Sequence, residues 1–400
     1  MSNISKAISE FKCGKVLIVT DNESRESEGD FVCAAAFCKA EDINFMVTNG
    51  RGLVCAAITE ERAIQLKLPM MAQRNTSRFE TAFTVSVEAK HGTTTGISAL
   101  ERALTVRTLA DISKGADDFI CPGHIFPLKA CNGGVLERDG HTESVIDLCR
   151  IAKLPPVGVL CEILNPDGTM ARMPQLIEIA EKHKLTLVTI QEIIDWRLTN
   201  EKLLKRVAAP ILPTKYGDFK AIAYRNKIND EEYIAIANMD TCENASVDVN
   251  VRIHSECLTG DVFHSLKCDC GEQLDFSLSY IAKYGGIFIY MLGHEGRGIG
   301  LANKLKAYEL QEHGLDTVEA NLKLGFSADQ RSYAFAAQIL KDFGIKSVNL
   351  LTNNPQKISE LEFYGIKVPK RIPVKIKPNS HNRKYLKAKK EKMGHLIPWI

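Results

Sequence analysis

The chain has 400 residues, of which 45% are hydrophobic and 25% charged, and its formal net charge is +2. That composition is typical of a globular protein, and the length exceeds what one hydrophobic core usually supports, so we expect two domains. The small net charge argues against nucleic acid or an anionic membrane as a partner, and no apolar run is long enough to span a bilayer.

Charge is divided unevenly between the two halves. Residues 1–199 hold 22 Lys and Arg against 26 Asp and Glu, a net of −4, whereas residues 200–400 hold 29 against 23, a net of +6. An acidic first half suits a cation site, and a basic second half suits a polyanionic substrate. The 12 cysteines are scattered and no secretory signal opens the chain, which predicts a reducing cytoplasm with free thiols.

Segments with helical and strand-like periodicity alternate through the first half. In chain order the pattern predicts a helix over 4–12, a buried strand over 15–20, a polar loop over 21–30, a helix, turn and strand over 43–59, a strand over 81–89, helices over 93–109, 145–154 and 174–184, a strand over 185–190 and a helix over 189–204. This alternation favours a sheet packed with helices.

The long helix gives way to a segment with two prolines over 205–219, so we divide the chain into domains 1–199 and 200–400. The pattern of the second domain predicts strands over 219–225, 231–237, 246–253, 286–292 and 347–354, and helices over 301–313 and 329–343. The Lys- and Arg-rich segment after Lys367 is expected to be a solvated tail. The predicted fold class is α+β (mixed α/β), with a mixed sheet packed with helices in each of two domains.

An acidic loop follows the first predicted strand. It surrounds Arg25 with five carboxylates, which are Asp21, Glu23, Glu26, Glu28 and Asp30. Like charges this close repel unless a cation lies among them. The loop is not an EF-hand, because Arg25 falls on the fifth position and Glu26 on that of the glycine. Mg2+ that keeps waters for a substrate fits better, and the alternative is a charged loop that is simply solvated.

Two histidines and a carboxylate complete the candidate site of the first half. His124 lies between a Pro-Gly turn and an apolar run, and His141 follows a glycine at the start of a helix. A histidine at a helix N-terminus tends toward the neutral form, which can bind a metal or act as a base. Glu162 ends an apolar strand and is a candidate for proton transfer. With an arginine for phosphate, this set suits chemistry on a hydroxy-ketone sugar phosphate.

Residues 4–200 resemble 3,4-dihydroxy-2-butanone 4-phosphate synthase through the motifs RESEGD, TAFTVSVEA, TTTGIS, PGHIFPL, GGVLERDGHTE and GVLCEI. The resemblance implies a lyase that converts ribulose 5-phosphate to 3,4-dihydroxy-2-butanone 4-phosphate and formate with Mg2+ or Mn2+. It implies Glu26 and His141 as metal ligands. It also implies His124, Glu162 and Cys55 as catalytic residues, with simple strand packing left open for Cys55. The residues implied to bind ribulose 5-phosphate are Arg25, Glu26, Asp30, Arg138, Gly140, His141, Thr142 and Glu162.

Three cysteines, Cys257, Cys268 and Cys270, lie on one short segment of the second half, in HSECLTGDVFHSLKCDCG. Three thiolates make a soft site suited to zinc, and no fourth cysteine follows nearby. A zinc ion with three protein ligands keeps a position for water, which indicates metal-assisted hydrolysis. The alternatives are a structural zinc with His254 or His264 as fourth ligand, and three unrelated buried cysteines.

Candidate phosphate-binding residues accompany the cysteines. The segment GHEGRGIGLANK places glycines before a helix, where backbone N–H groups can approach phosphate oxygens, and Arg297 adds charge. Asp329 and Arg331 are a candidate acid–base group and a cationic nucleophile or phosphate clamp. Thr352 and Lys357 lie on a turn after a predicted strand.

Residues 205–396 resemble GTP cyclohydrolase II through HSECLTGD, CDCG, EGRGIGL, DTVEAN, LGFSAD, LLTNNPQK and EKMGHL. The resemblance implies a hydrolase that converts GTP and water to 2,5-diamino-6-ribosylamino-4(3H)-pyrimidinone 5′-phosphate, formate and pyrophosphate. It implies that the three cysteines hold Zn2+ and that Mg2+ accompanies the nucleotide. Asp329 would accept a proton, Arg331 would attack or orient the α-phosphorus, and Tyr308 would support the site. The residues implied to bind GTP are Arg252, Ile253, His254, Ser255, Glu256, Gln273, Glu295, Gly296, Arg297, Thr317, Thr352 and Lys357.

Together the two resemblances imply a bifunctional enzyme of riboflavin biosynthesis, a lyase joined to a hydrolase, that acts on small molecules as a cytoplasmic homodimer. Intact motifs in both halves predict two working sites. The alternatives are a chain in which only one half is catalytic and the other is a scaffold, and a regulatory protein that senses GTP. The thiols beside Asp329 and Arg331 argue against a sensor. Nucleic-acid binding through the basic tail is disfavoured, because aromatic stacking platforms are absent.

Overall fold

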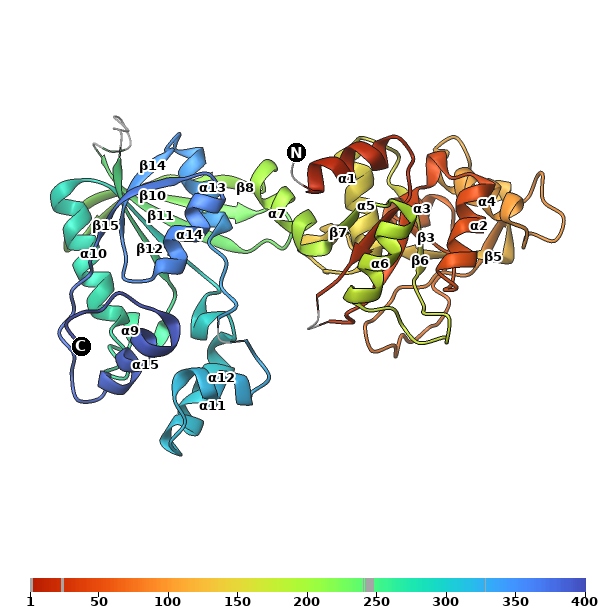
Figure 1. Ribbon diagram of the computed structural model, residues 1–400. Helices are drawn as coiled ribbons and strands as arrows, with labels where there is room; N and C mark the ends of the chain where they lie inside the picture. Colours follow the sequence, from red (N-terminus) through yellow and green to blue (C-terminus); the bar gives the residue numbers. More distant parts are fainter. Residues whose placement is uncertain (1–2, 23–24, 240, 242–247, 328) are drawn as a thin grey trace. The chain divides into compact units, whose positions relative to one another are not determined.

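The structure is a computed structural model that describes residues 3–22, 25–239, 241, 248–327 and 329–400. The chain divides into two compact units, Met1–Arg197 (unit 1) and Leu198–Ile400 (unit 2). Each unit contains a mixed sheet packed with helices (Figure 1), so the predicted fold class is confirmed. No helix in the described part of the chain is long and apolar enough to cross a lipid bilayer.

The strands of unit 1 are β1 Leu17–Thr20, β2 Gly29–Ala34, β3 Cys55–Ile58, β4 Val87–Ala89, β5 Phe119–Lys129, β6 Val157–Glu162 and β7 Leu187–Thr189. Its helices are α1 Asn3–Lys12, α2 Ala40–Asn49, α3 Glu60–Gln65, α4 Ala99–Ala110, α5 His141–Ala152, α6 Met173–His183 and α7 Ile190–Asn200. The strands form one sheet in the order β4-β5-β3-β6-β2-β1-β7. The pairs β1–β7 and β3–β5 are parallel, and the other neighbours are antiparallel.

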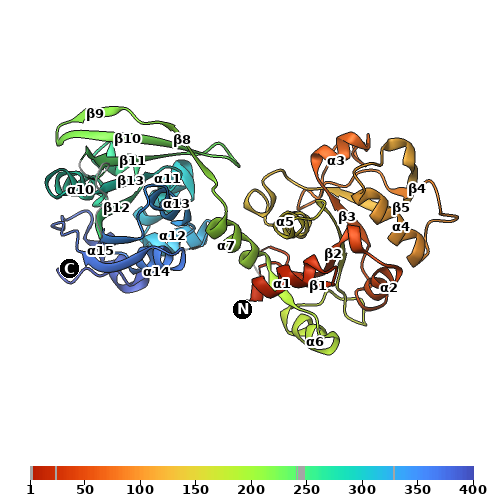
Figure 2. The ribbon, with the colours of Figure 1, turned by 90° about the horizontal axis from the view of Figure 1, so that it is seen from above.

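Helices cover both faces of the sheet of unit 1. Ile18 and Phe31 point to the face covered by α2, α4 and α6, whereas Leu17 and Val32 point to the face covered by α1, α5 and α7. Successive strand residues alternate between the two faces. Because helices cover both faces, the residues that point to either face are apolar. Figure 2 shows α5 on one side of β2 and β3, with α2 and α4 on the other. The polar loops at the strand ends are left to carry the chemistry.

The strands of unit 2 are β8 Leu204–Ala208, β9 Ile211–Thr214, β10 Gly217–Asn226, β11 Glu232–Asn238, β12 Val249–Ser255, β13 Ile287–Met291, β14 Ser347–Leu351 and β15 Lys367–Ile372. Its helices are α9 Leu258–Asp261, α10 Cys270–Tyr284, α11 Gly300–Glu312, α12 Thr317–Lys323, α13 Ala334–Asp342, α14 Pro355–Phe363 and α15 Arg383–Met393. The sheet order is β15-β14-β12-β13-β11-β10-β8, and β9 also pairs with β10. Strands β15, β14, β12 and β13 run parallel, and the rest pair antiparallel.

Two helices sandwich the sheet of unit 2. Ile281 of α10 packs against Phe219 and Phe288, in a cluster that also includes Ile236 of β11. Tyr233, on the same strand, lies with its ring centroid 5.3 Å from that of Phe335 in α13. Because Tyr233 and Ile236 are three positions apart along the strand, their side chains point to opposite faces of the sheet. Helices α10 and α13 therefore cover opposite faces.

Several elements differ from the sequence-based expectations. The strand expected over 81–89 is a strand only from Val87, the helix expected over 329–343 begins at Ala334, and β5 was not predicted. β5 contains two prolines, which weaken any strand signal because proline lacks an N–H donor. The first two residues of the strand expected over 246–253 lie outside the described residues. The expected solvated tail instead contains β15 and α15.

The packing of α5 on β6 can be tested at Gly158. A methyl group there would lie 1.9 Å from Cγ1 of Val145, a buried side chain with a stiff rotamer. Overpacking of this kind costs about 1 to 3 kcal/mol, so we expect Gly158→Ala to lower the free energy of unfolding of unit 1 by that amount. Gly115→Ala is the control, since a methyl there meets nothing within 4 Å. Equal urea midpoints for the two variants would contradict the expected packing.

Candidate functional site

Each unit brings one group of metal-binding side chains together. Among the described residues, two groups place their possible ligand atoms within 4.8 Å of one another: Asp21, Glu26 and His141 in unit 1, and Cys257, Cys268 and Cys270 in unit 2. The first group offers carboxylate oxygens and an imidazole, and the second offers only sulfur. The two donor sets are therefore suited to different cations.

The unit 1 group forms where the loop after β1 meets the start of α5. Backbone N–H groups of Glu26 and Glu28 donate to the Asp21 carboxylate at 3.0 and 2.8 Å, which folds the loop around that side chain. Arg25 Nη1 lies 3.1 Å from Asp21 Oδ2 and 2.9 Å from Glu26 Oε2. His141 Nδ1 lies 3.8 Å from Glu26 Oε2. Asp21 thus joins the two predicted ligands, whereas Glu23 lies outside the described residues.

His141 has the properties of a neutral ligand. Its side chain is buried, and burial lowers its pKa. Its Nε2 atom is buried without a hydrogen-bond partner in the part of the chain that the structure describes. A neutral imidazole with an unused nitrogen can bind a metal, and carboxylate oxygens are the ligands that Mg2+ prefers. The residues present therefore fit a divalent cation.

Asp30 and Glu162 form a carboxyl pair beside this group. They are register partners on the antiparallel strands β2 and β6, and Glu162 Oε2 accepts a 2.8 Å hydrogen bond from the backbone N–H of Leu53. Burial, and then the Glu162 charge, raise the pKa of Asp30 well above its usual range. Burial and Glu162 likewise raise the pKa of the Cys55 thiol, which disfavours a thiolate nucleophile. Asp30 is thus a proton-holding group that residue order alone did not indicate.

His124 has a different partner. Its Nδ1 lies 3.1 Å from Oε2 of Glu88, and Gly96 leaves room for that pair because a methyl there would lie 2.9 Å from the same nitrogen. Within the described residues, His124 pairs with Glu88 and not with Glu26 or His141. Glu88 was not predicted, although it lies within the motif TAFTVSVEA.

The N-terminus of α4 is capped by side chains of the helix itself and of the segment just before it. The hydroxyls of Thr94 and Ser98 both donate to the Glu101 carboxylate at 2.8 Å. These hydroxyls are therefore committed to capping the start of the helix.

Arg138, Gly140 and Thr142 surround the start of α5. Arg138 donates to Glu143 Oε2 at 2.6 Å and to the Phe79 carbonyl at 2.9 Å. Gly140 is the N-cap of α5, and a methyl there would lie 2.3 Å from Arg138 Nη1. Thr142 is buried. The guanidinium of Arg138 is thus held rigidly beside the helix that carries His141.

The sulfur group lies between the end of β12 and the start of α10. Cys257 Sγ is 3.7 Å from Cys268 Sγ, and Gly260 allows this approach because a methyl there would lie 2.8 Å from Cys268 Sγ. Hydrogen bonds from the other two thiols lower the pKa of Cys257 well below its usual range, whereas the pKa of Cys268 is raised to about 11. One thiolate therefore suppresses ionisation of its neighbours, and a soft dication would relieve that repulsion.

Histidine is not part of the sulfur group in the described ranges. His254 Nε2 is bonded to Asp261 Oδ1 at 3.0 Å, and its ring stacks on Tyr290 with centroids 5.5 Å apart. The described geometry therefore offers three ligands and does not supply His254 or His264 as a fourth. This arrangement matches the donor count of a catalytic zinc site rather than a closed structural one.

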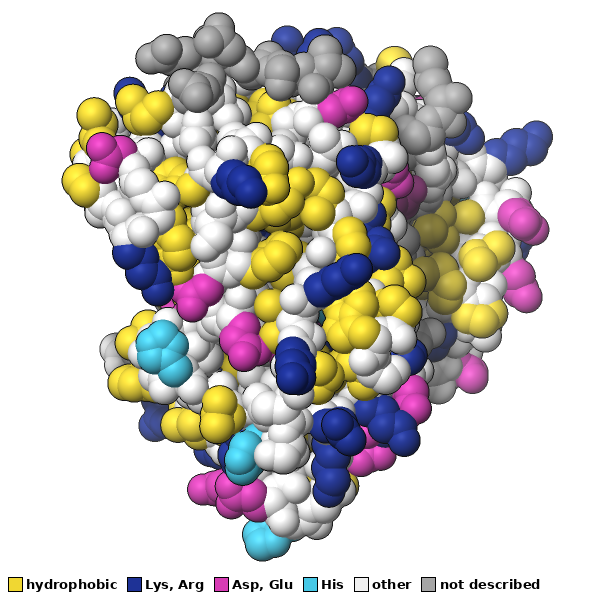
Figure 3. Space-filling model, turned by 90° about the vertical axis from the view of Figure 1, so that its left-hand side faces the viewer, with side chains coloured by type: hydrophobic (Ala, Val, Ile, Leu, Met, Phe, Trp, Pro, Cys, Tyr) yellow, Lys and Arg dark blue, Asp and Glu magenta, His cyan; other side chains and the backbone are white. Residues whose placement is uncertain are grey.

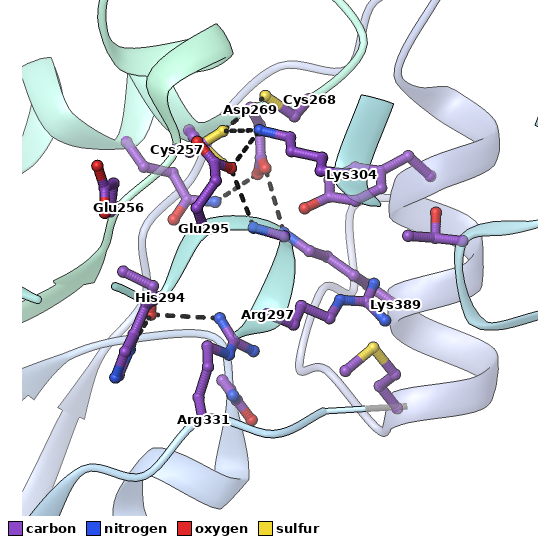
Figure 4. Close-up of a pocket in the computed structure, with 18 of the residues that line it drawn as sticks. Glu256, Cys257, Cys268, Asp269, His294, Glu295, Arg297, Lys304, Arg331 and Lys389 are labelled. Carbon is purple, nitrogen blue, oxygen red and sulfur yellow. Dashed lines mark hydrogen bonds and ion pairs between the residues drawn. The ribbon is translucent and has the colours of Figure 1, made fainter. Parts of the chain in front are cut away.

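A buried lysine lies against the sulfur group. Lys304 Nζ is 3.2 Å from Cys257 Sγ, 2.8 Å from Thr259 Oγ1 and 2.6 Å from Glu295 Oε1. Burial opposes its charge, but the Cys257 thiolate and the Glu295 carboxylate outweigh that effect and raise its pKa. Figure 4 shows Lys304 reaching toward Cys257. Lys304 was not predicted as a site residue. It lies one helical turn before Tyr308, which was predicted.

A pocket adjoins the sulfur group at the carboxyl ends of three parallel strands. The loops after β12, β13 and β14 converge there, which is where ligands bind in sheets of this kind. The pocket, with the solvent at its mouth, encloses about 1110 Å³, enough for a nucleotide. The predicted residues that line it are Arg252, His254, Ser255, Glu256, Cys257, Cys268, Cys270, Gln273, Glu295, Gly296, Arg297, Tyr308, Thr317, Arg331, Thr352 and Lys357.

Ile253 and Asp329, two predicted residues, support the pocket from behind. The Ile253 side chain is in the core, and its carbonyl accepts a 2.8 Å hydrogen bond from Lys357 Nζ. Asp329 binds Arg331 through two hydrogen bonds of 2.8 and 2.5 Å, and Arg331 also donates to Ser255 at 3.2 Å. Burial opposes ionisation of Asp329, but the guanidinium prevails and lowers its pKa. Asp329 thus orients Arg331 in this state.

Some residues that line the pocket were not predicted from the sequence. His294 lies beside the predicted Glu295, and Asp269 lies between two predicted cysteines, so their motifs already contained them. Burial, followed by Arg331 and Lys357, lowers the pKa of His294 to about 3. The remaining missed residues include Tyr385, Lys389 and His395. They belong to the expected tail, and His395 lies within the motif EKMGHL although no role was predicted for it.

Comparisons with known proteins identify one family in each half of the chain. A family model for 3,4-dihydroxy-2-butanone 4-phosphate synthase matches residues 5–196, and a family model for GTP cyclohydrolase II matches residues 205–373. Riboflavin biosynthesis protein RibBA of Aquifex aeolicus is 52% identical over 399 residues, which cover 99% of this chain and 98% of that protein. RibBA of Bacillus subtilis is 51% identical over 395 residues, which cover 98% of each.

A solved structure is similar along most of the chain. It is that of RibBX from A. baumannii, described as a two-domain 3,4-dihydroxy-2-butanone 4-phosphate synthase, with 33% identity, a TM-score of 0.70, and coverage of 94% of this chain and 100% of that one. The chain belongs to the family of bifunctional riboflavin biosynthesis enzymes, in which a 3,4-dihydroxy-2-butanone 4-phosphate synthase is joined to a GTP cyclohydrolase II.

Proposed function

We propose that both halves are catalytic and that one chain performs two formate-releasing reactions. Domain 1–199 converts ribulose 5-phosphate to 3,4-dihydroxy-2-butanone 4-phosphate and formate. Domain 200–400 converts GTP and water to 2,5-diamino-6-ribosylamino-4(3H)-pyrimidinone 5′-phosphate, formate and pyrophosphate. The observation that carries this proposal is that each unit holds its own group of metal-binding donors, oxygen and nitrogen in one and sulfur in the other. A scaffold or a GTP sensor would need neither group in that half.

In the first domain, the fitting ligands are Asp21, Glu26 and His141. Mg2+ or Mn2+ held there would supply positive charge to adjacent oxygens of the sugar phosphate. Asp30 holds a proton because burial and Glu162 raise its pKa, and Glu162 would accept one from substrate carbon.

The remaining predicted residues of this domain would bind the phosphate of the substrate or transfer protons. Arg25 and Arg138 offer guanidinium groups to the phosphate, since both already contact carboxylates through nitrogens that a phosphate can engage. His124, oriented by Glu88, would transfer a further proton. Cys55 remains a neutral thiol that packs beside the carboxyl pair.

In the second domain, the fitting ligands are Cys257, Cys268 and Cys270. Zn2+ held there would supply a Lewis acid that makes water nucleophilic near neutral pH. Lys304 offsets negative charge on the sulfur group. When Arg331 turns from Asp329 to the α-phosphate, Asp329 loses the partner that lowers its pKa and becomes able to accept a proton.

The proposed setting is a cytoplasmic homodimer that acts on small molecules. All eleven described cysteines are free, as a reducing compartment would keep them. The face of unit 2 in Figure 3 mixes basic, acidic and apolar side chains without one continuous basic patch, which disfavours a nucleic-acid partner. Light scattering of the purified chain tests the dimer, and a monomeric mass would contradict it.

Removing one sulfur ligand should silence one reaction only. Cys268→Ser replaces a thiolate with a hydroxyl that stays protonated, so we expect bound zinc to be lost and formate release from GTP to fall by more than about 100-fold. Formate release from ribulose 5-phosphate should be unchanged. Zinc content by mass spectrometry and a formate assay with each substrate measure both effects. Retained GTP turnover without zinc would contradict the assignment.

The reciprocal change lies in the acidic loop. Glu26→Gln keeps the shape of the side chain but removes the charge that faces His141 and Arg25. We expect formate release from ribulose 5-phosphate to fall by more than about 100-fold, because a ligand and a charge are lost together. GTP turnover serves as the internal control and should be retained. Loss of both activities would show that the two halves do not work independently.

Asp261 is expected to position Cys257. Its Oδ2 accepts hydrogen bonds from the Cys257 backbone N–H at 3.1 Å and from the Tyr290 hydroxyl at 2.9 Å. Such outer partners typically change metal affinity by about 10- to 100-fold, so Asp261→Asn should weaken zinc binding by that factor in a chelator competition. Asp275→Asn is the control, because that carboxylate lies on the exposed side of α10. Equal zinc affinities in both variants would refute the role.

A further inference from the structure

The C-terminal segment, residues 374–400, takes part in the nucleotide pocket. It lies beyond residues 205–373, which the GTP cyclohydrolase II family model matches. Apart from the motif EKMGHL, its sequence predicts only a basic tail. Nevertheless Tyr385, Lys389, Met393, His395 and Ile397 all line the pocket beside the sulfur group. The segment therefore contributes side chains to a site whose predicted residues all lie elsewhere in the chain.

The segment is attached to the turn that carries two of the cysteines. Asn382, which is completely buried, donates from Nδ2 to the Cys268 carbonyl at 3.4 Å. Lys389 Nζ lies 3.4 Å from Asp269 Oδ1, in the residue between Cys268 and Cys270. In Figure 4 Lys389 extends from the C-terminal helix into the pocket. Helix α15 is thereby fixed directly beside the proposed metal site.

The other attachments reach the remaining walls of the pocket. The backbone N–H of Leu396 donates to the Asn353 carbonyl at 2.8 Å, next to the predicted residue Thr352. Lys392 forms ion pairs with Asp316 and with Glu319, the latter at 2.9 Å, at the start of α12. The segment thus connects three separate parts of unit 2, and three of the residues that it contacts, Cys268, Asp269 and Asn353, line the pocket itself.

Positive charge gathers where the segment meets the pocket. The lining holds seven basic residues, Arg252, Lys267, Arg297, Lys304, Arg331, Lys357 and Lys389, against three acidic ones, Glu256, Asp269 and Glu295. Burial, followed by Lys389, Arg331, Lys357 and Arg297, lowers the pKa of His395 to about 2. These four basic side chains line the same pocket as His395, and burial and its basic neighbours lower the pKa of Lys357 well below its usual range. Positive charge is therefore disfavoured there unless an anion lies among these side chains. A polyphosphate is an anion of the required charge.

We propose, building on GTP hydrolysis by the second domain, that residues 374–400 close the phosphate end of the nucleotide pocket and that Lys389 binds the triphosphate. The Lys389 side chain is 13% exposed and its Nζ lies 4.3 Å from the Tyr385 ring centroid, so it is held in place rather than free in solvent. Its 3.4 Å ion pair with Asp269 is longer than a direct charged hydrogen bond. Lys389 can therefore exchange that carboxylate for a phosphate oxygen.

The test compares three lysine variants in the full-length, metal-loaded enzyme. Losing a charged hydrogen bond to phosphate should raise KM for GTP by about 10- to 100-fold in Lys389→Met, with a smaller change in kcat. Lys389→Arg keeps the charge and should restore most of the loss. Lys387→Met is the matched control, because Lys387 lies on the same helix with a side chain that is 65% exposed and paired with Glu391. It should behave as the unmodified enzyme.

Binding measurements separate a phosphate contact from a packing role. Calorimetry with a non-hydrolysable GTP analogue and with guanosine should show a loss of affinity in Lys389→Met for the triphosphate alone. Equal losses for both ligands, equal effects in Lys387→Met, or no loss in Lys389→Met would each overturn the proposal. Formate release from GTP by the unmodified enzyme tests the underlying function separately, so its absence would not be mistaken for failure of the lysine contact.

Discussion

Both sites depend on a scaffold that holds groups of like charge closer together than they would remain in water. In unit 1, Asp21 and Glu26 share the guanidinium of Arg25, and Asp30 stays protonated beside Glu162. In unit 2, three sulfurs lie together and only the Cys257 thiol ionises readily. Strands and helices packed on both sheet faces supply the rigidity that keeps these groups in place. Repulsion of this kind would favour a cation at each site.

The two donor sets would let one chain use two different metals, one at each site. Carboxylate oxygens with an imidazole favour a hard cation that retains water, whereas three thiolates favour zinc. A basic residue also lies against each set, the partly buried Arg25 in unit 1 and the buried Lys304 in unit 2. Arg25 and Lys304 thereby offset part of the negative charge of the donors.

The structure shows where the charged residues of the second half lie. The excess of basic residues in the second half gathers around the pocket at the carboxyl ends of β12, β13 and β14. Part of it comes from α15, which the sequence pattern assigned to a tail. A polyanionic substrate would therefore meet basic groups from the loops of the sheet on one side and from the C-terminal segment on the other.

Residue types and local spacing alone determined the helices with clear periodicity, the three cysteines, and the loop that holds Glu26, because these signals lie within a few residues of one another. Tertiary structure decided which distant groups meet. Asn382 reaches Cys268 across 114 residues, and Glu162 meets Asp30 only because β2 and β6 pair. The proton held by Asp30 and the charge held by Lys304 follow from burial and neighbours. Burial and long-range pairing are properties of the folded chain, and no local pattern encodes them.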